Sequence, residues 1–171
     1  MDNNYDDKFM ERAFALAEEA LKDNEVPVGC VFVHDGKEVG FGQNETNRTH
    51  NPTAHAEMNA IRQMEELIPN FRDILPELEL YVTLEPCIMC ASALYELGIR
   101  KIVYGAENDR FGGIRSVGNA GRYGYADNIK IINLVQADRS IDLLKQFYAN
   151  ENPFAPEDKK EKKRKPNECV K

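Results

Sequence analysis

The sequence predicts a single α/β domain built around a sheet of about five strands. The chain has 171 residues, 42% of them hydrophobic, which is enough for one domain with a buried core. Segments with apolar residues at helical spacing alternate along the chain with short apolar runs that are typical of strands. One predicted helix lies closely between two such strands and indicates a β-α-β unit, which places parallel strands side by side.

The N-terminal part predicts a helix, a hairpin and a second helix. Residues 6–23 have apolar side chains at helical spacing and charged residues on the other face. Two strands follow at 28–34 and 38–42, joined by an Asp-Gly turn. After a polar loop, the helical spacing returns from His55 to about Leu67.

The middle of the chain contains the predicted β-α-β unit. Residues 77–85 form a strand that is apolar enough to be central in the sheet. Residues 87–97 predict a helix, and Gly98 is suited to end it because glycine readily adopts left-handed dihedrals. The strand that completes the unit covers residues 100–106.

The C-terminal part predicts a loop, a strand and a last helix. Residues 107–128 are rich in glycine, asparagine and arginine and predict a loop. A fifth strand is expected within residues 129–135, and a helix over residues 138–149. The expected apolar side of this helix consists of Ile141, Leu144, the stem of Lys145 and Tyr148.

Charge divides the chain into two parts. Nothing beyond Pro153 predicts a packed element, so we expect a folded domain over residues 1–152 and a flexible basic tail over residues 153–171. Within residues 157–171, seven Lys or Arg and four Asp or Glu give a net charge of +3, whereas the other 156 residues, with 15 and 25, carry −10. The acidic part of the chain, residues 1–156, repels nucleic acid overall, whereas the basic tail does not.

The sequence has no feature that predicts export or membrane insertion. No apolar run approaches the length of a membrane span, and the first residues are acidic, so we expect no signal peptide, transit peptide or transmembrane helix. The four cysteines, at positions 30, 87, 90 and 169, are then not expected to form a disulfide framework. These features predict a soluble intracellular protein.

A histidine and a glutamate stand two residues apart where a helix is expected to begin. On a regular helix, His55 and Glu57 would point to nearly opposite sides. In the first turn the backbone is not yet helical, so both side chains can reach one point.

The segment "EPCIMC" supplies two further metal-binding side chains. Pro86 favours a helix start, and Cys87 and Cys90 are three residues apart, so both sulfurs face one way on a first turn. Zinc prefers thiolates and imidazoles, and His55 completes a set of three. Three protein ligands leave a position open for water, which is typical of a catalytic zinc rather than a structural one.

All these residues lie at predicted helix N-termini, which favour negative charge and lower thiol pKa values. A zinc ion with two thiolates and one neutral imidazole is formally uncharged, so it still acidifies a bound water. Glu57 is then not needed as a ligand and can act as a general base and afterwards as a general acid.

Each motif alone has a simpler explanation. Most His-x-Glu triplets arise by chance, and a Cys-x-x-Cys pair can be a redox pair or half of a structural zinc site. A redox pair leaves His55 and Glu57 unexplained. A structural site lacks a fourth ligand, because Cys30 lies within a strand and Cys169 in the tail.

The combined pattern resembles the signature of zinc-dependent nucleobase deaminases. The order of elements is similar to that of the cytidine deaminase superfamily, which implies a three-layer α/β/α fold with a central mixed sheet. The segments "EVPVG", "PTAHAEM" and "YVTLEPCIMC" resemble the tRNA adenosine deaminases. "YGAENDRFGG" and "FYANENPFAP" resemble the catalytic subunit of the eukaryotic tRNA wobble-adenosine deaminase, and the similarity covers roughly residues 6–156.

This resemblance implies a function and its partners. The family converts adenosine to inosine at the first anticodon position, and works as a heterodimer with a related subunit that lacks the catalytic glutamate. The expected partners are therefore the tRNA anticodon loop and such a non-catalytic subunit, and no membrane. The expected cofactor is one catalytic Zn²⁺ ion per chain, held by His55, Cys87 and Cys90, with Glu57 moving protons.

The resemblance also implies a substrate pocket. Asn44 is expected to contact the flipped nucleoside, and Val28 and Ala56 to line the base pocket. Without the resemblance, the sequence would predict that Asn44 is an ordinary turn residue and that Val28 belongs to the core side of a strand.

Two features depart from the family pattern. Asn59 is more typical of deoxycytidylate deaminases, and the segment "SVGNAGRYGYADN" is unusually rich in glycine. Hydrolytic attack on a carbon that bears an amino group does not choose between cytosine and adenine. A deaminase of free nucleotides and a catalytically silent zinc scaffold therefore stay as alternatives.

The tail contains six cations within residues 159–165. Such a run is a solvated tail or a nuclear import signal in many proteins, and we expect this protein in nucleus and cytoplasm. The alternative is that Lys162, Lys163, Arg164 and Lys165 contact tRNA phosphates.

Overall fold

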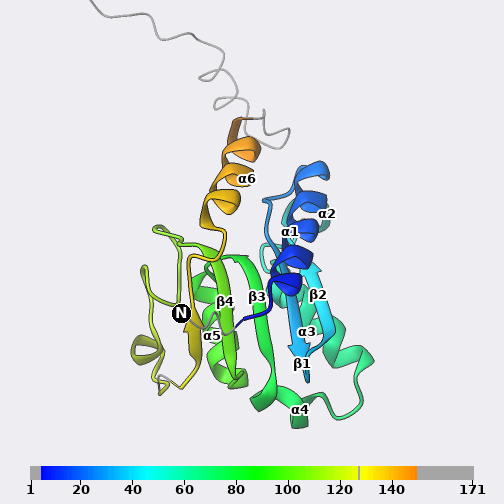
Figure 1. Cartoon of the computed structure of the whole chain (residues 1–171), viewed down its shortest axis with the longest axis vertical. Coiled ribbons are helices and arrows are strands. Elements are labelled where there is room, and N and C mark those ends of the chain that lie inside the picture. Colours follow the sequence, from blue (N-terminus) through cyan, green and yellow to red (C-terminus); the bar gives the residue numbers. More distant parts are fainter. Residues whose placement is uncertain (1–4, 127, 150–171) are drawn as a thin grey trace, which may run out of the picture.

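The computed structural model of the chain describes residues 5–126 and 128–149. Five strands form one sheet in the order β2-β1-β3-β4-β5, so the predicted central strand β3 is central (Figure 1). β3 is antiparallel to β1 and parallel to β4, which confirms a mixed sheet and the β3-α5-β4 unit. The strands are β1 (Gly29–His34), β2 (Lys37–Gln43), β3 (Glu79–Leu84), β4 (Lys101–Ala106) and β5 (Lys130–Ile132). The helices are α1 (Asp7–Lys22), α2 (Thr46–Thr49), α3 (Ala56–Leu67), α4 (Phe71–Ile74), α5 (Ile88–Leu97) and α6 (Ala137–Ala149), with 3₁₀ turns η1 (Leu75–Glu77) and η2 (Ala120–Tyr123).

Helices cover both faces of the sheet, which confirms the three-layer α/β/α fold (Figure 1). Side chains alternate between the two faces along each strand. Cys30 and Phe32 pack in the core layer that contains α3 and α5. Val31 and Val33, from the same strand, pack in the layer that contains α1 and α6.

Helix and turn boundaries follow local chemistry, and two of them, the Asp-Gly turn and the helix end at Gly98, were predicted from the sequence. Asp35 and Gly36 have φ values of 48° and 68°, as a tight hairpin turn requires. Asp6 caps α1 by accepting a hydrogen bond from the Lys8 amide at 3.1 Å. Gly98 ends α5 in the left-handed conformation, with φ at 64°.

α6 packs through a different face from the one that its apolar residues predict. Its buried residues are Ser140 and Leu143, and Ser140 Oγ donates to the Thr83 carbonyl at 2.5 Å. Gly105 lies beneath, where an added Cβ would be 2.3 Å from Ser140 Oγ, so two small residues let the helix approach the sheet. The predicted packing face is therefore wrong, and its members are exposed or line a cavity: Ile141, Leu144, Lys145 and Tyr148.

The glycine-rich loop at 107–128 folds over α5. The ring of Tyr95 on α5 lies 5.9 Å from that of Tyr123 and 6.2 Å from that of Tyr125. The Tyr123 hydroxyl donates to the Gly113 carbonyl at 3.1 Å. A Cβ at Gly118 would lie 1.9 Å from that hydroxyl, so the close packing of this loop requires glycine there.

Some predictions concern the ends of the chain. The boundary between residues 152 and 153 and the basic tail lie outside the described residues. Among the residues that the structure describes, no helix is both long and apolar enough to cross a membrane.

Candidate active site

Three metal-binding side chains meet at the beginnings of two helices. His55 is the N-cap of α3 and Cys87 the N-cap of α5, both with extended backbone dihedrals, and Cys90 lies in the first turn of α5. His55 Nδ1 lies 3.4 Å from Cys87 Sγ and 3.6 Å from Cys90 Sγ. β3 leads directly into Cys87, so the group lies at the carboxyl end of the central strand, where open α/β sheets bind ligands.

These distances fit a zinc ion. Zinc binds thiolate sulfur at about 2.3 Å and imidazole nitrogen at about 2.0–2.1 Å, and tetrahedral geometry then separates sulfur and nitrogen by about 3.5 Å. The donor atoms of His55, Cys87 and Cys90 all lie within 4.8 Å of one another. Within the described residues this group has three members, as in catalytic zinc sites, which keep one position for water or substrate.

The three donors share protons at close range. The pKa of the Cys87 thiol is lowered to about 4, because its hydrogen bonds with Cys90 and then with His55 outweigh the effect of burial. The pKa of Cys90 is raised by its hydrogen bond to Cys87 and by burial. The pKa of His55 is raised by its hydrogen bond to Cys87. A bound dication replaces such shared protons and holds both sulfurs as thiolates.

Glu57 follows His55 by two residues, yet both line the same cavity. This is possible because His55 is the extended N-cap residue and Glu57 belongs to the first turn. Glu57 is only 3% exposed, and burial raises the pKa of its carboxyl group. A raised pKa brings a carboxyl group toward the range in which it both accepts and releases a proton.

The site opens into a cavity of about 730 Å³. Val28, Asn44 and Ala56, the three residues expected to bind the nucleoside, all line it. Leu144 and Tyr148 of α6 line it as well and were missed by sequence reasoning. The apolar face of α6 is the pattern that could have identified them, because that face is not used for packing on the sheet.

Loop 107–111 forms another part of the cavity wall. Phe111 is 58% exposed, and the Arg110 guanidinium lies 5.4 Å from its ring centre. The sequence predicts the loop but carries no sign that it borders the site.

Glu85 fixes the shape of this loop. The side chain is 1% exposed, and the pKa of its carboxyl group is lowered: burial raises it, but hydrogen bonds to the charged form outweigh burial. One oxygen accepts from the amides of Ile114, Arg115 and Ser116 at 3.0, 2.7 and 3.0 Å, and the other accepts from the Asn108 amide at 3.0 Å and from the Ser116 hydroxyl. Sequence reasoning missed this role.

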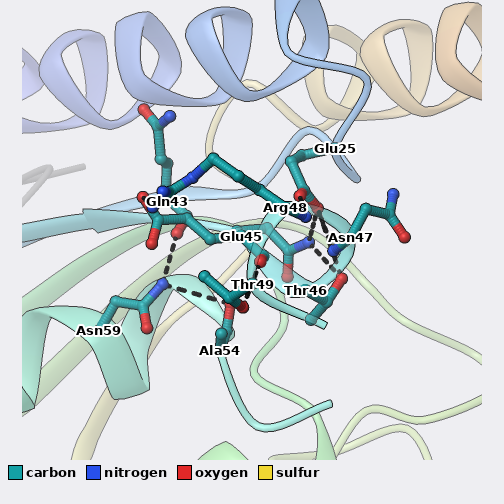
Figure 2. A network of polar contacts seen from close by, with 10 residues as sticks. Glu25, Gln43, Glu45, Thr46, Asn47, Arg48, Thr49, Ala54 and Asn59 are labelled. Atoms are coloured by element: carbon teal, nitrogen blue, oxygen red, sulfur yellow. Dashed lines mark hydrogen bonds and ion pairs between the residues drawn. The ribbon is translucent and has the colours of Figure 1, made fainter. Parts of the chain in front are cut away.

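Asn59 has a structural role through the contacts drawn in Figure 2, and it does not line the cavity. Its Nδ2 donates to the carbonyls of Gln43 at 3.0 Å and Ala54 at 3.2 Å, which ties α3 to the edge strand β2 and to the preceding loop. The Asn59 amide donates to the His55 carbonyl at 2.9 Å as part of α3, but the residue does not line the cavity, so its presence does not favour a deoxycytidylate substrate.

The basic residues proposed to contact RNA cannot be placed relative to this site. Lys162, Lys163, Arg164 and Lys165 lie outside the described residues.

Fold and site together define a class of protein. Zinc-dependent nucleobase deaminases combine a His/Cys/Cys donor set with a glutamate that is not a ligand, in the order His-x-Glu then Pro-Cys-x-x-Cys. Residues 3–106 of this chain match the family described as the cytidine and deoxycytidylate deaminase zinc-binding region.

Relatives narrow the class further. The tRNA-specific adenosine deaminase 2 of Xenopus tropicalis is 48% identical over 162 residues, which cover 91% of this chain and 95% of that protein. The tRNA-specific adenosine deaminase subunit tad2 of Schizosaccharomyces pombe is 38% identical over 91% of this chain and 40% of its own length. The chain belongs to the cytidine and deoxycytidylate deaminase family and, within it, to the tRNA-specific adenosine deaminase 2 proteins.

Solved structures agree with this assignment. One, from a study of A-to-I editing by tRNA:A34 deaminases at the wobble position of transfer RNA, is 33% identical. Its TM-score is 0.71, and the match covers 81% of this chain and all of that one. A guanine deaminase from Nitrosomonas europaea, 19% identical with a TM-score of 0.69 over 85% of this chain and 86% of its own, shares the fold.

Proposed function

We propose that this chain catalyses the zinc-dependent hydrolytic deamination of adenosine to inosine at the wobble position of tRNA. The main support is the combination of relative and site. The chain is 48% identical to a tRNA-specific adenosine deaminase 2, and its three zinc-type donors lie together beside a cavity that a buried glutamate also lines. His55, Cys87 and Cys90 hold the metal in this proposal, and Glu57 acts on the substrate.

The reaction replaces the amino group on C6 of adenine with oxygen from water and releases ammonia. Zinc, when bound, supplies a Lewis acid that lets water react as a nucleophile near neutral pH. As water adds across the C6–N1 double bond, Glu57 takes one water proton and delivers it to N1. It then passes the proton of the new hydroxyl group to the departing amino group, so inosine and ammonia form and Glu57 returns to its starting state. Its burial keeps that proton from exchanging freely with solvent.

The cavity also determines how the substrate enters. A base inside a stacked anticodon cannot reach buried residues, so the nucleotide must swing out of its stack. Val28 and Ala56 offer apolar contacts to the base, and the exposed Phe111 offers a ring at the cavity wall on which a neighbouring base can stack.

We infer that a second, related subunit completes the enzyme. α5 carries apolar residues all round, and a helix of this kind is normally covered on every side. On its outer side Ile88 is 44% exposed, and Met89, Ala93 and Leu97 are half-buried. The net negative charge of residues 1–156 supports the same inference. Phosphate contacts dominate affinity for nucleic acid, so a second subunit must supply positive surface that this domain lacks. A homodimer of this chain is the competing assembly.

We further propose that the basic run at 159–165 assists tRNA binding, with nuclear import as the competing role, and that the enzyme works in both nucleus and cytoplasm. The run carries six cations broken only by Glu161. Fluorescence localisation of the full chain and of a variant without these cations tests whether the run acts as a nuclear import signal.

One assay separates the proposed function from its alternatives. The purified zinc-loaded chain, alone and with a candidate second subunit, is offered tRNA and free nucleotides in parallel. We expect inosine in tRNA and no ammonia from deoxycytidylate. Ammonia from free nucleotides alone would indicate a nucleotide deaminase, and no product from any substrate would indicate a silent scaffold.

A further inference from the structure

A buried carboxylate that the reaction does not use lies behind the cavity wall. Glu25 follows α1 and is only 1% exposed. A carboxylate removed from water needs several hydrogen-bond donors, and this one has four, three of them from residues labelled in Figure 2. Its two oxygens accept from Asn44 Nδ2 at 3.0 Å, Thr46 Oγ1 at 3.4 Å, the Asn47 amide at 3.1 Å and the Arg48 amide at 2.6 Å.

This arrangement fixes which way the Asn44 carboxamide faces. An ionised carboxylate only accepts hydrogen bonds, so the group of Asn44 that meets Glu25 must be its NH₂. The same nitrogen donates to Thr46 Oγ1 at 3.0 Å, so both of its hydrogens have partners within the protein. The carbonyl oxygen Oδ1 is then the atom that Asn44 can offer to a ligand.

Asn44 is held where only the cavity gives access to it. Asn44 follows β2, and its backbone amide donates to the Val28 carbonyl at 3.0 Å. The residue as a whole is only 5% exposed. It lines the same cavity as Glu57. A substrate group that meets Asn44 must therefore supply a hydrogen-bond donor.

The chemistry of the substrate restricts that donor. The base edge of adenine has one donor, its amino group, and its ring nitrogens are acceptors. The amino group is the one expelled, so it must lie beside Glu57. Within an RNA chain the 3′ oxygen is esterified, which leaves the 2′-hydroxyl of the target nucleotide as the donor that can meet Asn44.

We propose that Glu25 is a positioning residue that makes Asn44 an acceptor for the 2′-hydroxyl of the deaminated nucleotide. The proposal rests on the proposed function. Glu25 does not touch substrate, and its effect passes through Asn44. The site thereby distinguishes a ribonucleotide from a deoxynucleotide at the reacting position.

The test compares wild-type and variant enzyme on two substrates that differ only in the 2′-hydroxyl of the target nucleotide. Glu25→Ala removes the carboxylate and with it the acceptor that fixes the Asn44 NH₂, so the carboxamide is free to turn and Oδ1 is no longer held toward the cavity. The substrates are two anticodon stem-loops that differ only in adenosine or 2′-deoxyadenosine at the target position, and kcat/KM is measured with zinc-loaded enzyme and its partner.

We expect the wild type to prefer the ribose substrate by about tenfold or more, the worth of one hydrogen bond to a well-placed acceptor. The Glu25→Ala enzyme should lose most of that preference and use the two substrates within about twofold of each other. A merely structural role would slow both substrates by the same factor and keep the preference. The matched control is Glu45→Ala, because Glu45 belongs to the same loop and pairs outward with Arg48 at 2.6 Å, so the preference should persist.

Three results would overturn parts of this reasoning separately. A wild type that makes no inosine in either substrate refutes the proposed function. A wild type that makes inosine equally from both substrates refutes recognition of the 2′-hydroxyl. A Glu25→Ala enzyme that is slower but keeps the full ribose preference refutes the positioning role. If Glu25→Ala fails to fold or to hold zinc, Glu25→Asp, which withdraws the carboxylate from Asn44 by one methylene, tests the same contact, and an unchanged ribose preference in that variant also refutes it.

Discussion

Replacing Glu85 with glutamine tests whether one buried carboxylate holds the loop at the cavity wall. Glu85→Gln keeps size and shape but turns one acceptor oxygen into an NH₂ donor. Whichever way the new amide faces, its NH₂ meets backbone donors. The less costly orientation keeps an oxygen for the amides of Ile114, Arg115 and Ser116 and places NH₂ against the amide of Asn108.

The cost follows from these contacts. The Asn108 amide loses its acceptor, which costs about 1–3 kcal/mol for a group shielded from water. The three remaining hydrogen bonds lose the benefit of a charged acceptor, and together this adds about 1–2 kcal/mol. The Ser116 hydroxyl can rotate and accept from the new NH₂, so it adds little. We expect a total loss of about 3 kcal/mol, or a drop in Tm of about 6–12 °C for a domain of this size.

Urea unfolding of the zinc-loaded protein, followed by circular dichroism, measures this loss, and hydrogen exchange at Ile114, Arg115 and Ser116 locates it. The control is Glu65→Gln, the same chemical change on an exposed part of α3, which should alter stability by less than about 0.5 kcal/mol. A Glu85→Gln protein that is as stable as the control variant, with loop amides that exchange at the wild-type rate, would show that Glu85 does not hold the loop.

Four other predictions concern the metal, the proton shuttle, the partner and the tail. Cys87→Ala should lose zinc by metal analysis, whereas Cys30→Ala, in the core but outside the donor group, should keep about one zinc per chain. Glu57→Gln should keep zinc and fold but lose about 10²–10⁴ in kcat, and near-normal turnover would show that another group moves the proton. The chain alone should deaminate tRNA poorly over a wide concentration range, and full activity from a homodimer would contradict the need for a partner. Alanine at residues 162–165 should flatten the salt dependence of tRNA binding without changing zinc content or stability.

Those parts of the site that lie within short motifs were predictable from the sequence. His55 and Cys87 both begin helices, and helix starts have strong local rules, so the motifs place each donor on its helix, and the preference of zinc for imidazole and thiolates predicts that they meet. The fold was predictable for a similar reason, because the β-α-β unit is contiguous and its handedness leaves few arrangements.

Parts of the site that depend on contacts between distant segments were not predictable. Glu25 and Glu85 look like ordinary surface glutamates in the sequence, yet each is buried against a loop that begins about twenty residues further on. The face of α6 was misjudged because hydrophobicity favours Ile141 and Tyr148, whereas close approach to the sheet favours a small residue, Ser140. Asn59, which the sequence marks as more typical of deoxycytidylate deaminases, has a local structural role instead.

The negative charge of the catalytic domain indicates that tRNA binding needs further, positively charged contacts. Residues 1–156 carry a net charge of −10, so the catalytic domain repels the phosphates of the substrate that it must bind. Six cations within residues 159–165 offer compensation, and their contribution should be electrostatic and independent of tRNA sequence. Each phosphate contact in a single-stranded region contributes about 0.7 to the log–log slope of affinity against salt. Removing four cations at 162–165 should therefore reduce that slope by about 3, equally for all substrate tRNAs. An unchanged slope, together with loss of the protein from the nucleus, would make the run an import signal and leave the whole of the missing positive charge to the partner subunit.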